Sequence, residues 1–170
     1  MFLVIDFVKK LINCSAIEDI IIIGILDPED EVIEFIPDYT SFFIRINQYY
    51  LHFESIEQFS KLRVSVVDEI RYHDVSDDDF KHSFLSIANL LLENGLHSNV
   101  LINKFELYNC RVEQDCFICD AAKILLSNGQ VCFFDPSNYW GICVGDKICE
   151  MRWMNNLSAQ QIDEMIITVV

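Results

Sequence analysis

The cysteines are the residues of this chain whose spacing most directly suggests chemistry. Cys116-Phe117-Ile118-Cys119 is a C-x-x-C motif, a spacing used by zinc sites and by dithiol redox centres. A structural zinc site needs two further closely spaced ligands, and the four histidines lie well upstream of this motif. A redox motif lies between a strand and a helix, whereas the residues around Cys116 are typical of a strand that points Cys116 and Cys119 to opposite faces. We therefore expect buried free thiols, with no metal site and no cofactor.

A nucleophilic enzyme is the alternative interpretation of the same cysteines. Cys and His partners meet in space rather than in sequence, so a Cys/His-dependent hydrolase stays open as a second hypothesis. No local signature of such enzymes occurs, nor does a glycine-rich phosphate loop, H-E-x-x-H or G-x-S-x-G. The sequence predicts no catalytic residue and favours a binding protein over an enzyme.

Acidic side chains are the second group that could act on a partner. The 170 residues include 27 Asp and Glu against 12 Lys and Arg, a formal net charge of −15, although 52% of the residues are hydrophobic. Solubility of a small domain needs a charge magnitude of only about 2–8, and a larger excess costs self-repulsion in the folded state. Such a surface repels nucleic acid and anionic membranes and speeds encounter with basic proteins. We expect a basic protein partner, without direct contact to nucleic acid or membrane.

Two acidic stretches are predicted to bind this partner, each carboxylate opposing a Lys or Arg. They comprise Asp74, Asp77, Asp78 and Asp79 in the first stretch, and Glu113, Asp115 and Asp120 in the second. The aspartates at 77–79 also fit the first turn of a helix, where the helix dipole favours negative charge, so part of the excess has a local explanation.

Aromatic residues near a turn complete the candidate interface. Tyr139 and Trp140 follow the turn-forming residues 135–138, and Trp153 lies further along the chain. Tyr and Trp are enriched at protein interfaces, where they act as anchors. The alternative is that these side chains complete the core. The sequence leaves both open.

Three helices are expected to position these residues. Residues 2–13 place Asp6, Lys9, Lys10 and Asn13 on one face of a helix and apolar residues on the rest. The second predicted helix covers about residues 77–93, with an apolar stripe at spacings of four, three and four, and Asn94-Gly95 at its end. The third covers residues 158–168 and opens with capping-box spacing.

The rest of the chain is predicted to form strands. The unbroken apolar run from Ile20 to Leu26 is typical of a strand covered on both faces. Asn128-Gly129 and Gly145-Asp146 indicate two hairpins, and residues 56–61 suggest a short helix. We predict an α+β fold for residues 1–170 as a single domain, with helices packed on a largely antiparallel sheet.

The expected location is the cytoplasm. The N-terminal residues lack the order of charged, apolar and cleavage regions that a signal peptide has, and no apolar run is long enough to cross a bilayer. The seven cysteines are an odd number and fit a compartment that keeps thiols reduced.

As a profile, the whole chain resembles the immunity proteins of bacterial toxin systems, in particular those of contact-dependent growth inhibition. The segments 71–79 (RYHDVSDDD) and 133–140 (FFDPSNYW) have the look of that group. The resemblance implies a protein that binds the toxic domain of its cognate effector, often a basic nuclease, and occludes its active site or substrate groove. An acidic adaptor domain of a larger assembly is a further alternative. The oligomeric state is not specified by the sequence.

Overall fold

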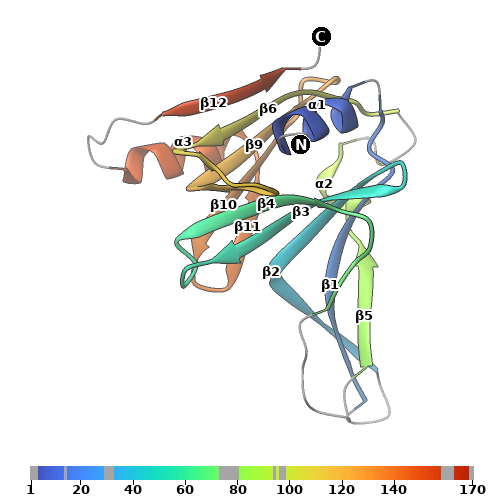
Figure 1. The fold of residues 1–170 in the computed structure, drawn as a ribbon. Coiled ribbons are helices and arrows are strands. Elements are labelled where there is room, and N and C mark those ends of the chain that lie inside the picture. Colours follow the sequence, from blue (N-terminus) through green and yellow to red (C-terminus); the bar gives the residue numbers. More distant parts are fainter. Residues whose placement is uncertain are drawn as a thin grey trace.

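The described strands form two antiparallel sheets that share one core (Figure 1). The computed structural model describes residues 4–13, 15–28, 33–72, 81–93, 95, 99–157 and 163–168. The strands of the first sheet are β1 Asp19–Asp27, β2 Glu34–Ile46, β3 Tyr49–Ile56, β4 Lys61–Val67, β5 Lys81–Ser86, β7 Arg111–Val112 and β8 Cys116–Cys119. Those of the second are β6 Ile102–Tyr108, β9 Ala121–Leu126, β10 Val131–Asn138, β11 Gly141–Gly145 and β12 Glu164–Thr168.

The strand order within each sheet differs from the order of the strands along the chain. The first sheet runs β5-β1-β2-β3-β4-β8-β7 and the second β11-β10-β9-β6-β12. The described helices are α1 Val4–Ile12, α2 Ala88–Leu91 and α3 Lys147–Asn156. The predicted α+β class with largely antiparallel sheets is therefore confirmed.

The core lies between the inner faces of the two sheets. Phe53 of β3 stacks on Phe134 of β10 with ring centroids 4.1 Å apart, and meets Phe105 of β6 edge-on at 6.2 Å. All three rings are fully buried. Because alternate residues of a strand point to the same face, these rings all point into the space between the sheets, and their contacts join the two sheets.

The central strand β1 is covered on both faces, as its apolar run predicts. Ile20 and Ile22 belong to the core between the sheets. Ile21 and Ile23 form a smaller cluster with Phe43 on the outer face, where the partly buried Ile70 and Tyr72 pack against it. The prediction of a strand buried on both sides is confirmed.

The first predicted helix is confirmed over the described residues 4–12. Val4, Val8, Leu11 and Ile12 of α1 are buried in the main core, while Asp6, Lys9 and Lys10 are exposed. Phe7 meets Tyr49 of β3 edge-on at 5.2 Å. The amphipathic pattern therefore identified both the helix and its buried face.

The helix predicted at 77–93 is wrong over most of its described part. Residues 81–86 are strand β5, which pairs antiparallel with β1 from Leu26 opposite Lys81 to Ile21 opposite Ser86. Helix α2 is confined to Ala88–Leu91, and residues 77–80 lie outside the described residues. The cause is tertiary, since β1 has hydrogen-bonding groups on both edges and β5 satisfies the edge that β2 leaves open.

The helix predicted at 158–168 is also wrong where it is described. Residues 164–168 form β12, which pairs antiparallel with β6 from Glu164 opposite Tyr108 to Thr168 opposite Lys104. The preference of β-branched residues for strands agrees with this pairing, because Ile166, Ile167 and Thr168 are all β-branched. Residues 158–162 lie outside the described part.

Of the two predicted hairpins and the predicted short helix, one hairpin is confirmed and the other two predictions are wrong. Asn128-Gly129 joins β9 to β10 as a hairpin, with Gly129 at φ +88°. Asp146 instead caps α3, its carboxylate accepting hydrogen bonds from the backbone N–H of Ile148 at 2.8 Å and of Cys149 at 3.3 Å. The predicted helix at 56–61 is a turn whose residues 57–59 have left-handed φ values of 51–63°.

Removal of the ring that joins the sheets should be strongly destabilising. We expect Phe53→Ala to lower the free energy of unfolding by about 3–5 kcal/mol, because the cavity would lie between two sheets that cannot close over it. Urea unfolding followed by circular dichroism measures the change. Phe84→Ala, the same substitution at a side chain 57% exposed on β5, is the matched control and should have a small effect. Equal losses in the two variants would contradict the assignment of the core.

Candidate functional site

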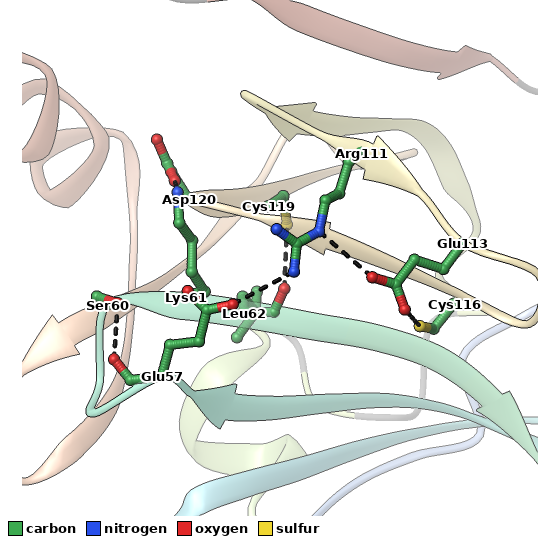
Figure 2. Close-up of polar contacts among 9 residues, drawn as sticks. All are labelled: Glu57, Ser60, Lys61, Leu62, Arg111, Glu113, Cys116, Cys119 and Asp120. Carbon is green, nitrogen blue, oxygen red and sulfur yellow. Dashed lines mark hydrogen bonds and ion pairs between the residues drawn. The ribbon is translucent and has the colours of Figure 1, made fainter.

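The second predicted acidic cluster lies beside the β3–β4 turn and the β7–β8 hairpin (Figure 2). Asp120 follows β8, and its carboxylate accepts a hydrogen bond from Lys61 Nζ of β4 and one from Asn109 Nδ2 at 2.6 Å. The Asp120 side chain is only 21% exposed. Its charge is therefore balanced within the chain.

Glu113 is likewise bound by a cation of its own hairpin. Arg111 extends between two carboxylates in Figure 2, with Nε 3.3 Å from Glu113 Oε1 and Nη2 3.3 Å from Glu57 Oε1. The thiol of Cys116 donates to Glu113 Oε2 at 3.7 Å. Asp115, the third predicted residue of this cluster, is exposed. Two internal cations, Lys61 and Arg111, thus offset part of the negative charge of these four carboxylates.

The C-x-x-C motif lies on β8, as predicted, and both of its thiols are buried. Cys119 faces the main core, and its thiol donates to the Leu62 carbonyl at 3.7 Å, whereas Cys116 lies on the opposite face of the strand. Burial raises the pKa of Cys119 well above its usual value, and burial followed by the charges of Glu113 and Asp115 raises that of Cys116. Among the described residues, no group of three or more His, Cys, Asp or Glu is placed to hold a metal ion.

The first predicted acidic cluster cannot be placed in this arrangement. Asp74, Asp77, Asp78 and Asp79 lie outside the described residues. The segment that precedes them ends with Tyr72, whose ring lies 4.9 Å from that of His82 on β5. The last described residue before them therefore lies against β5.

The two predicted aromatic residues at the β10–β11 turn are exposed. Tyr139 is 80% and Trp140 75% exposed, and their rings meet edge-to-face with centroids 5.0 Å apart. Trp153 is 6% exposed and packs between Tyr108 and Phe133 on the outer face of the second sheet. The core alternative thus applies to Trp153, whereas the exposure of Tyr139 and Trp140 suits interface anchors.

Trp140 also borders an apolar groove that the sequence analysis did not identify. The groove has a volume of about 690 Å³ and is lined by residues of β1, β2, β5, α2, β10 and β11. Tyr39, Leu85 and Leu90 line it together with Trp140. No period-2 or period-3.6 pattern could have found it, because its walls come from six separate elements.

A bulge in β2 creates the groove. Ile22 pairs with Phe42 and Gly24 with Pro37, so residues 38–41 of β2 lie opposite a single residue of β1. The Asp38 carboxylate stabilises this excursion by accepting from the backbone N–H of Thr40 at 2.9 Å and from its hydroxyl at 2.6 Å. At Gly141, φ is +117° and an added Cβ would lie 2.5 Å from the Tyr39 carbonyl oxygen. Glycine therefore allows β11 to approach the bulge.

A buried ionic cluster lies on the opposite side of the second sheet, beneath α3. Lys123 Nζ of β9 is 2.5 Å from Glu106 Oε2 of β6 and 2.8 Å from Glu150 Oε1 of α3. The Tyr108 hydroxyl donates to Glu150 Oε1 at 2.7 Å, and Lys104 also pairs with Glu106. Burial raises the pKa of Glu106, but hydrogen bonds and charge from both lysines outweigh it and hold that pKa below its usual value. Two carboxylates and two ammonium groups balance, so the cluster attaches α3 to the sheet.

Comparison of the chain with protein-family models, curated proteins and solved structures gave no significant match. Within the described part of the chain, each helix is too short or too polar to cross a membrane. Function must therefore be inferred from charge, exposure and shape.

The buried cluster leads to a stability prediction. We expect Lys123→Met to lower the free energy of unfolding by about 3–5 kcal/mol, because it leaves Glu106 and Glu150 without their shared cation. Urea unfolding followed by the fluorescence of the buried Trp153 measures this. Lys147→Met removes an exposed lysine of α3, the helix that the cluster attaches, and should change stability by no more than about 0.5 kcal/mol. Similar effects of the two substitutions would show that the cluster does not hold α3.

The buried thiols lead to a prediction about reactivity. Burial raises the pKa of both Cys110 and Cys132 to about 11, so very little thiolate is present at neutral pH. We expect iodoacetamide to modify these two residues and Cys119 at least about tenfold more slowly in the native protein than in urea. Mass spectrometry of tryptic peptides gives the rates. A cysteine that reacts faster in the native state would instead identify a nucleophile and revive the hydrolase hypothesis.

Proposed function

We propose that this protein is an immunity protein of the cytoplasm that binds a cognate toxin domain, a basic nuclease in the first instance, and neutralises it by charge-complementary occlusion. The observation that carries the proposal is an exposed aromatic pair, Tyr139 and Trp140, on a chain with a net charge of −15. An exposed pair of aromatic rings on a highly charged protein suits a site that a partner covers.

The charge excess is too large to be satisfied within the chain. Even if each of the 12 Lys and Arg paired with one carboxylate, 15 of the 27 Asp and Glu would remain without a cation. The observed ion pairs already engage at least seven of these cations. The remaining negative field attracts a basic protein, and a nuclease domain must present a positive surface to phosphate groups.

Charge and aromatic anchors would have different roles in such a complex. Long-range attraction raises the association rate and falls with ionic strength. Aromatic side chains that become buried slow dissociation, since interface substitutions act mainly on the dissociation rate. Fast capture with slow release is what an inhibitor of a lethal enzyme requires.

The thiol hydrolase is less well supported by the same structure. The pKa values of five described cysteines are raised, and burial is the largest cause at each one. The Ser41 hydroxyl lies 2.6 Å from His52 Nε2, but Ser41 is 1% exposed and closed to a substrate. These observations favour a binding protein. An adaptor domain would share the exposed surface and differ from an immunity protein in its effect on cells.

Growth rescue tests the proposal and separates it from the adaptor. Co-expression with the toxin domain encoded beside this protein should restore growth, and the two chains should purify as a 1:1 complex. Raising NaCl from about 50 to 500 mM should lower the association rate at least about tenfold, while the dissociation rate changes little. Surface plasmon resonance measures both rates.

A matched pair of variants tests the aromatic anchors. Tyr139→Ala should raise the dissociation rate about tenfold or more, whereas Met151→Ala, at a side chain 55% exposed on α3, should not. A stable partner without growth protection would indicate an adaptor. The absence of any basic partner would end the proposal.

A further inference from the structure

The groove beside Trp140 is an apolar surface that the fold leaves uncovered. Leu90 is 81% exposed, Trp140 75%, Leu85 48% and Tyr39 47%, and all four border the groove. Among the described residues that line it, Asn138 is the most polar and none carries a charge. In a solvated protein, a contiguous apolar surface of this kind marks a binding site. The high exposure of its rim suits a protein segment better than a small enclosed ligand.

The surroundings of the groove are strongly acidic. Among the described residues of the elements that line it, and of the two positions beyond each end, the carboxylates are Glu18, Asp19, Asp27, Glu34, Asp38, Glu93, Asp135 and Asp146, and the cations are Arg45, Lys81 and Lys147. Arg45 is already paired with Glu18. Lys81 and Lys147 are therefore outnumbered by the remaining carboxylates. The groove combines an uncharged lining with an acidic excess on the elements that form it.

The acidic cluster at the β7–β8 hairpin differs from the groove in its charge balance and in what a partner would gain by binding there. Glu113 is paired with Arg111 and Asp120 with Lys61, so cations of the same chain already offset their charge. A partner that approached there would have to displace these ion pairs before gaining new ones. At the groove, the apolar residues gain contacts without losing any.

We infer that the groove binds an apolar segment of the partner that is flanked by Lys or Arg side chains. The inference rests on the proposed function, in that the segment belongs to the toxin domain, and it assigns the contact to the groove rather than to the β7–β8 cluster. The apolar residues of the segment pack against Trp140, Leu85 and Leu90. Its cations face the carboxylates of the elements that form the groove, where the two charges attract without being buried.

A synthetic peptide that alternates lysine and leucine tests this chemistry directly. Trp140 is exposed and Trp153 is buried, so a blue shift of tryptophan emission on titration reports the covering of Trp140. We expect a saturable shift with this peptide, none with the matching glutamate–leucine peptide, and loss of the shift in Trp140→Phe. No saturable shift up to about 1 mM, or equal shifts with both peptides, would overturn the inference.

Two lysine substitutions separate the groove from bulk charge. Leu90→Lys on α2 and Met151→Lys on α3 change the net charge equally, and both side chains are exposed in the structure, so both variants should fold. Leu90→Lys should weaken binding of the lysine–leucine peptide about tenfold or more, while Met151→Lys should leave it nearly unchanged. Equal weakening would mean that the peptide follows net charge alone, and the inference would fail.

The same variants distinguish this inference from the proposed function. If Leu90→Lys protects cells from the toxin domain as well as wild type does, the groove is not the contact and the immunity function stands. If wild type gives no protection but the lysine–leucine peptide binds at Trp140 with the expected variant pattern, the immunity function fails and the groove still binds a basic apolar segment.

Discussion

The fold depends on the burial of β1, a strand too apolar to face water on either side or to leave an edge unpaired. Its inner residues enter the core between the sheets, and its outer residues Ile21 and Ile23 pack under Ile70 and Tyr72. Its two edges are paired with β2 and β5. A buried backbone N–H or carbonyl without a partner costs as much as a lost hydrogen bond. This requirement explains why residues 81–86 form a strand although their spacing also suits a helix.

The same requirement shapes the surface that is available for binding. Because β5 extends the first sheet, α2 follows it directly (Figure 1), and residues of α2 line the groove together with Tyr39 of the β2 bulge. The bulge then brings Tyr39 against Gly141 of β11, where a side chain would collide with the backbone. The groove is therefore a consequence of how the first sheet is completed. Its exposed apolar side chains are ones that the core does not bury.

The carboxylates of this molecule fall into two groups, those paired with a cation of the chain and those without one. Where cations are near, carboxylates are neutralised internally, as in the buried cluster of Glu106, Lys123 and Glu150 that attaches α3 to the second sheet. The excess that remains has no cation of the chain to pair with, because the chain has more than twice as many acids as bases. A polar network that is satisfied strengthens the fold, whereas an unsatisfied surface charge acts at a distance on other molecules. Position within the fold decides which role each carboxylate has.

The sequence by itself determined the class of fold, the helix at 4–12, the doubly buried strand at 20–26 and the hairpin at Asn128-Gly129, because each depends on local periodicity or on the conformational freedom of a glycine. It also determined the charge excess and pointed to Tyr139 and Trp140. Tertiary structure alone decided that residues 81–86 and 164–168 are strands, since the partner edges come from distant parts of the chain. It alone decided that Asp120 and Glu113 are bound by Lys61 and Arg111 and that Trp140 borders a groove. Such pairings depend on which elements become neighbours, and no local pattern records that.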